Sequence, residues 1–216
     1  MAEPFFPSWT NKLRELSGLA AVGGLVYATV VIYFGFSPKT TDVGYQPIQP
    51  VPYSHQLHAG DMGFDCRYCH NTVEQTAQAS IPPTSVCMNC HERIRVTSDK
   101  LKPLREAHAE GKPLMWKKVH DLPDYVYFNH SAHVNKGVSC VECHGRIDKM
   151  EVVKQEMPLS MGWCLECHRD PAPRLRPREF VTQLDWTTQE DRRTLGERLM
   201  KEYDVKTSTD CSTCHR

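Results

Sequence analysis

The sequence lacks an excess of either charge, and it lacks any cysteine outside one repeated pattern. Lys and Arg together number 26 and Asp and Glu together number 26, so the formal net charge is zero. A chain without a basic excess gives no reason to expect nucleic acid as a partner. All ten cysteines occur in copies of Cys-x-x-Cys-His, and none is left over. A disulfide framework has no use for a histidine after every second cysteine, so this class is excluded.

Long apolar stretches are scarce as well, and only one has the length of a membrane span. Residues 16–38 contain no charged residue, and nearly all of residues 18–36 are apolar or glycine. A helix rises about 1.5 Å per residue, so this run is about 34 Å long, whereas the hydrocarbon core of a bilayer is about 30 Å thick. A buried core helix would be shorter and would carry a polar stripe. The run therefore predicts one transmembrane helix.

The flanks of this run argue against a cleaved signal peptide. Some fifteen residues, including two prolines, precede it, and no small-x-small cleavage site follows it. Lys12 and Arg14 come before the run, and the positive-inside rule then keeps the N-terminus in the cytoplasm. We expect residues 1–15 to be a cytoplasmic segment, residues 16–38 to be a single-pass anchor in the cytoplasmic (inner) membrane, and residues 39–216 to lie on the periplasmic side.

Five copies of Cys-x-x-Cys-His account for the cysteines. Two thiols three positions apart on a helical turn can form thioethers with the two vinyl groups of one porphyrin, and the next histidine then lies under the iron as its proximal ligand. A redox dithiol occurs singly in a thioredoxin-like fold, and zinc ribbons do not require the trailing histidine. We therefore predict five covalently bound haem c groups, attached through Cys66, Cys69, Cys87, Cys90, Cys140, Cys143, Cys164, Cys167, Cys211 and Cys214, with the proximal ligands His70, His91, His144, His168 and His215.

Cofactors of this size take over much of the core, so the chain needs few long apolar segments of its own. The 15 prolines and 12 glycines suit a chain that passes around cofactors through turns. The predicted fold is mainly α and irregular, with little β structure, and consists of the membrane helix and a multihaem cytochrome c domain whose haems form the core.

The supply of further iron ligands covers every haem. Outside the motifs the chain has six histidines, and it has eight methionines in all. No Cys-x-x-Cys-Lys variant, which would mark a catalytic haem, is present. This count argues against an open coordination position and against a substrate bound at iron, so electron transfer, without an enzymatic activity of the chain itself, is the prediction.

An internal repeat identifies most of the distal ligands. Residues 53–70 align with residues 128–144, so that His55 corresponds to His130 and His58 to His133. The two members of each pair are three positions apart and cannot easily serve one face of one iron, so we expect them to bind different haems. The repeat predicts two two-haem modules, at about 52–95 and 125–170, and a fifth haem on a C-terminal extension at about 187–216.

The repeat does not identify the distal ligand of the fifth haem. His120 is the candidate, and Met157 and Met161 are the alternatives, since a thioether would raise the potential of that haem relative to two histidines. His108 falls in a predicted helix at 98–111 and is expected to be a surface or hydrogen-bonded residue.

These motifs resemble those of known cytochromes. His-x-x-His before Cys-x-x-Cys-His is similar to the class III multihaem cytochromes. Five motifs behind an N-terminal anchor, together with LPDYVYFNH and MPLSMGWCLECHRDP, resemble the pentahaem c-type cytochrome subunit of alternative complex III. The resemblance implies that His55 binds the haem of His70 and His130 that of His144, while His58 and His133 reach other haems in their modules.

The resemblance also implies a role and partners. Quinol would be oxidised in polytopic membrane subunits, and electrons would pass along the haems to a monohaem cytochrome, an oxidase or a soluble carrier, with an iron–sulfur subunit in the same complex. A stand-alone quinol dehydrogenase that feeds a periplasmic reductase is the alternative. A multihaem reductase is a third possibility, and it would need a five-coordinate iron.

Two further features of the C-terminal third carry expectations. Four arginines between Arg169 and Arg178 could pair with haem propionates, contact a partner or form a solvated loop. Thr187 and Glu190 have the spacing of a capping box at the start of a surface helix that covers residues 187–203.

Overall fold

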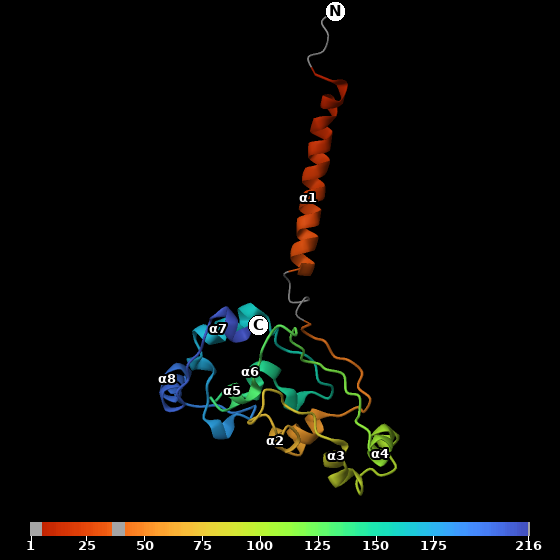
Figure 1. The fold of residues 1–216 in the computed structure, drawn as a ribbon, viewed down its shortest axis with the longest axis vertical. Coiled ribbons are helices and arrows are strands. Elements are labelled where there is room, and N and C mark those ends of the chain that lie inside the picture. The colour runs from red at the N-terminus through yellow and green to blue at the C-terminus, as the bar shows by residue number, and fades with distance from the viewer. Residues whose placement is uncertain (1–5, 36–41, 216) are drawn as a thin grey trace, which may run out of the picture. The chain divides into compact units, whose positions relative to one another are not determined.

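A computed structural model describes residues 6–35 and 42–215, and the chain divides into two compact units, Met1–Val43 and Gly44–Arg216. The first unit contains a short 3-10 helix, η1 (Ser8–Lys12), and the helix α1 (Leu13–Gly35), which Figure 1 shows as one uninterrupted helix. No residue of α1 is buried. Its length and its apolar composition make α1 a candidate membrane anchor.

The observed helix begins three residues before the predicted span. Arg14 and Glu15 belong to its first turn, because both residues are good helix formers and an apolar run does not by itself define where a helix starts. The predicted positions 36–38 lie outside the described residues.

The second unit consists of short helices joined by long loops, as Figure 1 shows. Among its described residues there is no strand, and only two isolated antiparallel bridges occur, Val126 with His215 and Val138 with Leu175. The expected mainly helical and irregular fold is therefore confirmed. The elements are η3 (Gln56–Asp61), α2 (Cys66–Cys69), α3 (Thr84–His91), η4 (Asp99–Leu101), α4 (Lys102–Ala109), α5 (His130–Val134), α6 (Cys140–His144), η5 (Ile147–Lys149), α7 (Met161–Arg169), η6 (Ala172–Arg174), η7 (Arg178–Phe180), α8 (Arg192–Glu202) and α9 (Cys211–Cys214).

The helices that carry the motifs begin at polar capping residues or at proline. Asp65 accepts a hydrogen bond from the backbone at the start of α2, Ser139 does so for α6 and Ser160 for α7. Pro83 precedes α3 and has no amide hydrogen to satisfy. These caps give each motif the helical turn that places its two thiols on one side.

The apolar core of the second unit is small and divided. Only 13 apolar side chains are buried among the described residues, and ten of them form three separate clusters around Leu175, Met88 and Val181. A domain of this size normally buries one contiguous core. The shortage supports the expectation that prosthetic groups complete the core.

The predicted start of the last long helix is wrong. The helix α8 begins at Arg192 and not at Thr187, and its N-cap is Asp191, whose side chain accepts a hydrogen bond of 3.0 Å from the amide of Thr194. Aspartate is at least as good an N-cap as threonine. Asp191 stands immediately before the first turn with a buried apolar residue, so the helix begins there and the predicted capping box of Thr187 and Glu190 does not form.

One glycine of α8 permits its packing against η6. A Cβ at Gly196 would overlap the carbonyl oxygen of Ala172, so this close approach requires glycine. We expect Gly196→Ala to destabilise the folded protein by about 1–3 kcal/mol, because backbone on both sides must move. Thermal unfolding of the haem-loaded protein measures this loss. Glu197→Ala, on the exposed side of the same helix, is the control, and an equal shift in both variants would contradict the packing argument.

Candidate functional site

The five motifs present unpaired thiols next to an imidazole. All ten cysteines are free in the structure. Cys66, Cys140 and Cys211 each begin a short helix, whereas Cys87 and Cys164 are each the fourth residue of a longer helix, α3 and α7. Both arrangements keep the two thiols of a motif on one helical turn, with the histidine after them. The donor set of each motif thus fits covalent haem attachment.

The histidines of the motifs are held in one tautomer. A backbone carbonyl can only accept, so a ring Nδ1 close to it must carry the hydrogen, and Nε2 is then left with a lone pair for a metal. Four of the five motif histidines have this arrangement. Nδ1 of His70 donates to the carbonyl of Ser80 (2.8 Å), and Nδ1 of His91 donates to that of Ile94 (3.2 Å). Nδ1 of His168 donates to the carbonyl of Ser208 (2.9 Å), and Nδ1 of His215 donates to that of Tyr125 (3.3 Å).

Three of the five histidines predicted as distal ligands are oriented in the same way. Nδ1 of His58 lies 2.8 Å from the carbonyl oxygen of Ser54. Nδ1 of His130 lies 2.9 Å from that of Ala77, and Nδ1 of His133 lies 2.7 Å from that of Asn129. His58 and His133 each use the carbonyl four positions earlier, so the repeat extends to hydrogen bonding. Nε2 of all three is therefore available to a metal.

Three pairs of imidazole rings have the separation that one iron between them requires. A metal–imidazole bond is about 2 Å long, so two imidazoles on opposite sides of one ion have ring centres about 6 Å apart. The ring centres are 6.3 Å apart for His58 and His91, 6.5 Å for His130 and His144, and 6.0 Å for His133 and His168. The residues present fit haem with two axial histidines at these positions.

His55 lies near His70 in a half-buried position. Burial lowers the pKa of His55 to about 4, and the neighbouring His70 adds to this effect. Burial likewise lowers the pKa of His144 to about 3. A histidine binds a metal in its neutral form, so both sites favour the form that ligation needs.

Two aromatic rings support the paired histidines, and the prediction from sequence had given them no role. Tyr53 contacts His55 and stacks on His58, with ring centres 4.8 Å and 4.4 Å away. Phe128 makes the equivalent contacts with His130 and His133, at 4.7 Å and 4.6 Å. The signal was available, since both rings stand two residues before the first histidine of the repeat.

His120 contacts the third motif. Its Nε2 lies 3.3 Å from Nδ1 of His144, where the other motif histidines have a backbone carbonyl. The contact places His120 beside the third motif, and its role as the distal ligand of the fifth haem stays a prediction.

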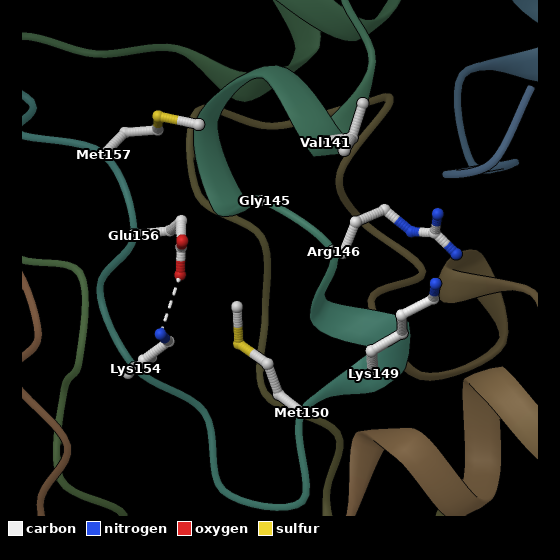
Figure 2. A pocket seen from close by; sticks show the side chains of 8 residues that line it. All are labelled: Val141, Gly145, Arg146, Lys149, Met150, Lys154, Glu156 and Met157. Atoms are coloured by element: carbon white, nitrogen blue, oxygen red, sulfur yellow. Dashed lines mark ion pairs between the residues drawn. The ribbon is translucent and has the colours of Figure 1, made fainter.

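The remaining candidates take other positions. Met157 lines a cavity of about 450 Å³ beside α6, whose wall also includes Val141, Met150 and Arg146, as Figure 2 shows. Met161 begins α7 and is 65% exposed. His108 lies in α4 with its Nδ1 3.3 Å from the hydroxyl of Thr84, in agreement with the expected packing role.

Two of the four arginines after the fourth motif, Arg174 and Arg176, pair with carboxylates of the chain. Arg174 lies 3.3 Å and Arg176 3.6 Å from Glu142, which stands between the two cysteines of the third motif. Arg176 is buried and lies over the ring of Trp186, and Arg178 lies over that of Tyr203. A solvated loop, one of the three expected outcomes, therefore does not describe this segment.

The comparisons with known proteins agree with this chemistry. Residues 126–216, which hold the third, fourth and fifth motifs, match the family of cytochrome c7 and related cytochrome c. This part of the chain is therefore similar to cytochrome c7 and related cytochrome c.

A curated relative adds a second line of comparison. The chain is 31% identical over 140 residues to the multihaem cytochrome c subunit of a menaquinone reductase from Nitratidesulfovibrio vulgaris (strain Hildenborough). The alignment covers 62% of this chain and 66% of that protein, slightly less than two thirds of its length.

Proposed function

We propose that this chain is a membrane-anchored electron-transfer subunit with five covalent haem c groups. It would connect a quinol-oxidising membrane complex with a periplasmic cytochrome or a terminal oxidase, as in alternative complex III. The haems supply one-electron reduction and oxidation, and the chain holds, orients and insulates them. The spacing of the three imidazole pairs carries the proposal, because iron with both axial positions taken by protein has no place for a substrate.

Each residue set has a defined part in this proposal. The ten motif cysteines hold the haems, and the five motif histidines are the proximal ligands. His58 is the distal ligand for the second haem, His130 for the third and His133 for the fourth, because of the ring separations. His55 is assigned to the first haem, as the resemblance to class III multihaem cytochromes implies. The fifth haem has its proximal ligand in His215, and His120 is the candidate for its distal ligand, with Met157 and Met161 as alternatives.

The proposed location follows from the anchor. The helix α1 crosses the cytoplasmic membrane with the N-terminus inside, and the haem domain lies on the periplasmic side. The partners are polytopic quinol-binding subunits, an iron–sulfur subunit and a monohaem cytochrome of the same complex, with an oxidase or a soluble carrier downstream.

The named relative favours a second possibility for the direction of electron transfer. It belongs to a menaquinone reductase, so a complex that delivers electrons to a quinone is the competing assignment. A stand-alone quinol dehydrogenase is a further alternative.

Mild detergent extraction separates these functions. We expect the chain to purify in a stable stoichiometric complex with polytopic subunits, and this complex to reduce an added cytochrome c when supplied with menaquinol. A complex that instead reduces menaquinone from a reduced cytochrome would reverse the direction. Isolation of the chain alone with full quinol oxidation would establish the stand-alone dehydrogenase.

A further inference from the structure

Residues inside neighbouring Cys-x-x-Cys-His motifs contact one another, and these contacts connect the motifs pairwise. The first connection joins the first and second motifs. The side-chain amide of Asn89 donates a hydrogen bond of 3.4 Å to the hydroxyl of Tyr68. Each of these residues stands directly before the second cysteine of its motif, so the two attachment helices α2 and α3 lie next to each other.

The second connection joins the first and third motifs, which belong to different modules. The amide of Cys140 donates to the carbonyl of Val181 at 3.2 Å, and Sγ of Cys66 lies 4.0 Å from the carbonyl oxygen of the next residue, Thr182. The thiols of Cys66 and Cys140 lie close enough to shift each other's pKa. The two modules therefore meet at their first motifs.

The third connection joins the third and fourth motifs through one arginine. Arg174 lies 3.3 Å from the carboxylate of Glu142 and 4.0 Å from that of Glu166. Each glutamate is the residue before the second cysteine of its motif, the same position that Tyr68 and Asn89 occupy in the other module. The helices α6 and α7 therefore both contact the guanidinium of Arg174, each through the residue before the second cysteine of its motif.

The fourth connection joins the fourth and fifth motifs. Nδ1 of His168 lies 2.9 Å from the carbonyl oxygen of Ser208, and the hydroxyl of Ser208 lies 2.9 Å from that of Thr213. Thr213 again precedes the second cysteine of its motif. The C-terminal segment therefore attaches the fifth site beside the fourth.

We propose that the five attachment sites form one unbranched row in the order second, first, third, fourth and fifth. The order differs from that in the chain because the modules meet at their first motifs and not end to end. This inference rests on the proposed function, since it requires all five motifs to carry haem.

A separate observation identifies the ends of this row. Among the ten cysteines, Cys90 of the second motif and Cys211 of the fifth are exposed, and the other eight are partly buried. Partner proteins with a redox cofactor near their surface therefore exchange electrons with the chain at the second and fifth sites.

The position of the irons in the native complex tests the row directly. An experimental structure of the haem-loaded full chain in its complex should show the iron at His70 between those at His91 and His144, and the iron at His168 between those at His144 and His215. The nearest redox cofactor of each partner subunit should face His91 or His215. A different order, a site with three near neighbours or a partner cofactor closest to a middle site overturns the row. Five haems in another order would leave the proposed function standing, whereas fewer than five would contradict it as well.

Potentiometry of a variant provides a second measurement. Cys211→Ala combined with Cys214→Ala removes the fifth haem, and the midpoint potential of the fourth haem should shift while those of the first and second stay unchanged, because the coupling between charges falls with distance and is screened. The matched control, Cys87→Ala with Cys90→Ala, should shift the first haem and leave the fourth unchanged. A shift of the first haem on loss of the fifth overturns the order.

Discussion

Replacement of Cys140 and Cys143 with alanine will produce a protein that carries one haem fewer and is much less stable than the parent. The thioethers of the third haem need these two thiols, so the intact mass should fall from five haems to four. The third site lies where the two modules meet, and Ser139, directly before it, is only 1% exposed and donates a hydrogen bond to the carbonyl of Val181. An empty site there removes the contacts that the cofactor makes with both modules.

The fifth site offers the matched control for this change. Cys211→Ala with Cys214→Ala also removes one haem, but α9 has no buried residue and joins the rest of the unit mainly through the bridge between Val126 and His215. The thermal midpoint should therefore fall less than it does for the third site. Intact mass spectrometry and thermal unfolding measure both variants. An unchanged mass, or a larger loss of stability at the fifth site, would show that this account of the third site is wrong.

His133→Met will raise the midpoint potential of the fourth haem. The ring of His133 is paired with that of His168 at 6.0 Å, so a thioether would replace the distal imidazole of this haem. A methionine ligand stabilises the reduced iron, and axial ligands span a range of about 0.8 V, so we expect a rise on the order of 100 mV with the iron still low-spin. Spectropotentiometry and electron paramagnetic resonance measure the two properties.

A histidine that binds no iron in this assignment provides the control for that substitution. His108 contacts the hydroxyl of Thr84 on α3, so His108→Met should leave all midpoint potentials unchanged. If His133→Met shifts the third haem and leaves the fourth as it was, the assignment of the two distal histidines in the second module must be exchanged.

The attachment sites could be predicted from the sequence because their chemistry is local. Two thiols and an imidazole within five consecutive residues need only one turn of helix, and the structure provides that turn at all five motifs. The paired histidines were also predictable, because the repeat places His55 with His130 and His58 with His133. The matching contacts of Tyr53 and Phe128 show that the repeat preserves the surroundings of the histidines as well as their spacing.

Positions without a repeat were harder to predict. His120 has no counterpart in the first module, and the count of spare histidines alone suggested it as an iron ligand. Its hydrogen bond to His144 depends on how the loop before α5 folds over α6, which no spacing in the sequence encodes. The start of α8 was misplaced for a related reason, since several polar residues could have capped it and Asp191 did.

The sequence by itself predicts which cofactor the chain holds and which residues attach it, because covalent haem chemistry depends on neighbours along the chain. Only the tertiary structure decided which sites lie side by side. That order depends on contacts between residues far apart in sequence, such as Cys66 with Cys140 and Arg174 with Glu142. Such contacts form only when the two modules pack together, and the row of attachment sites is a consequence of that packing.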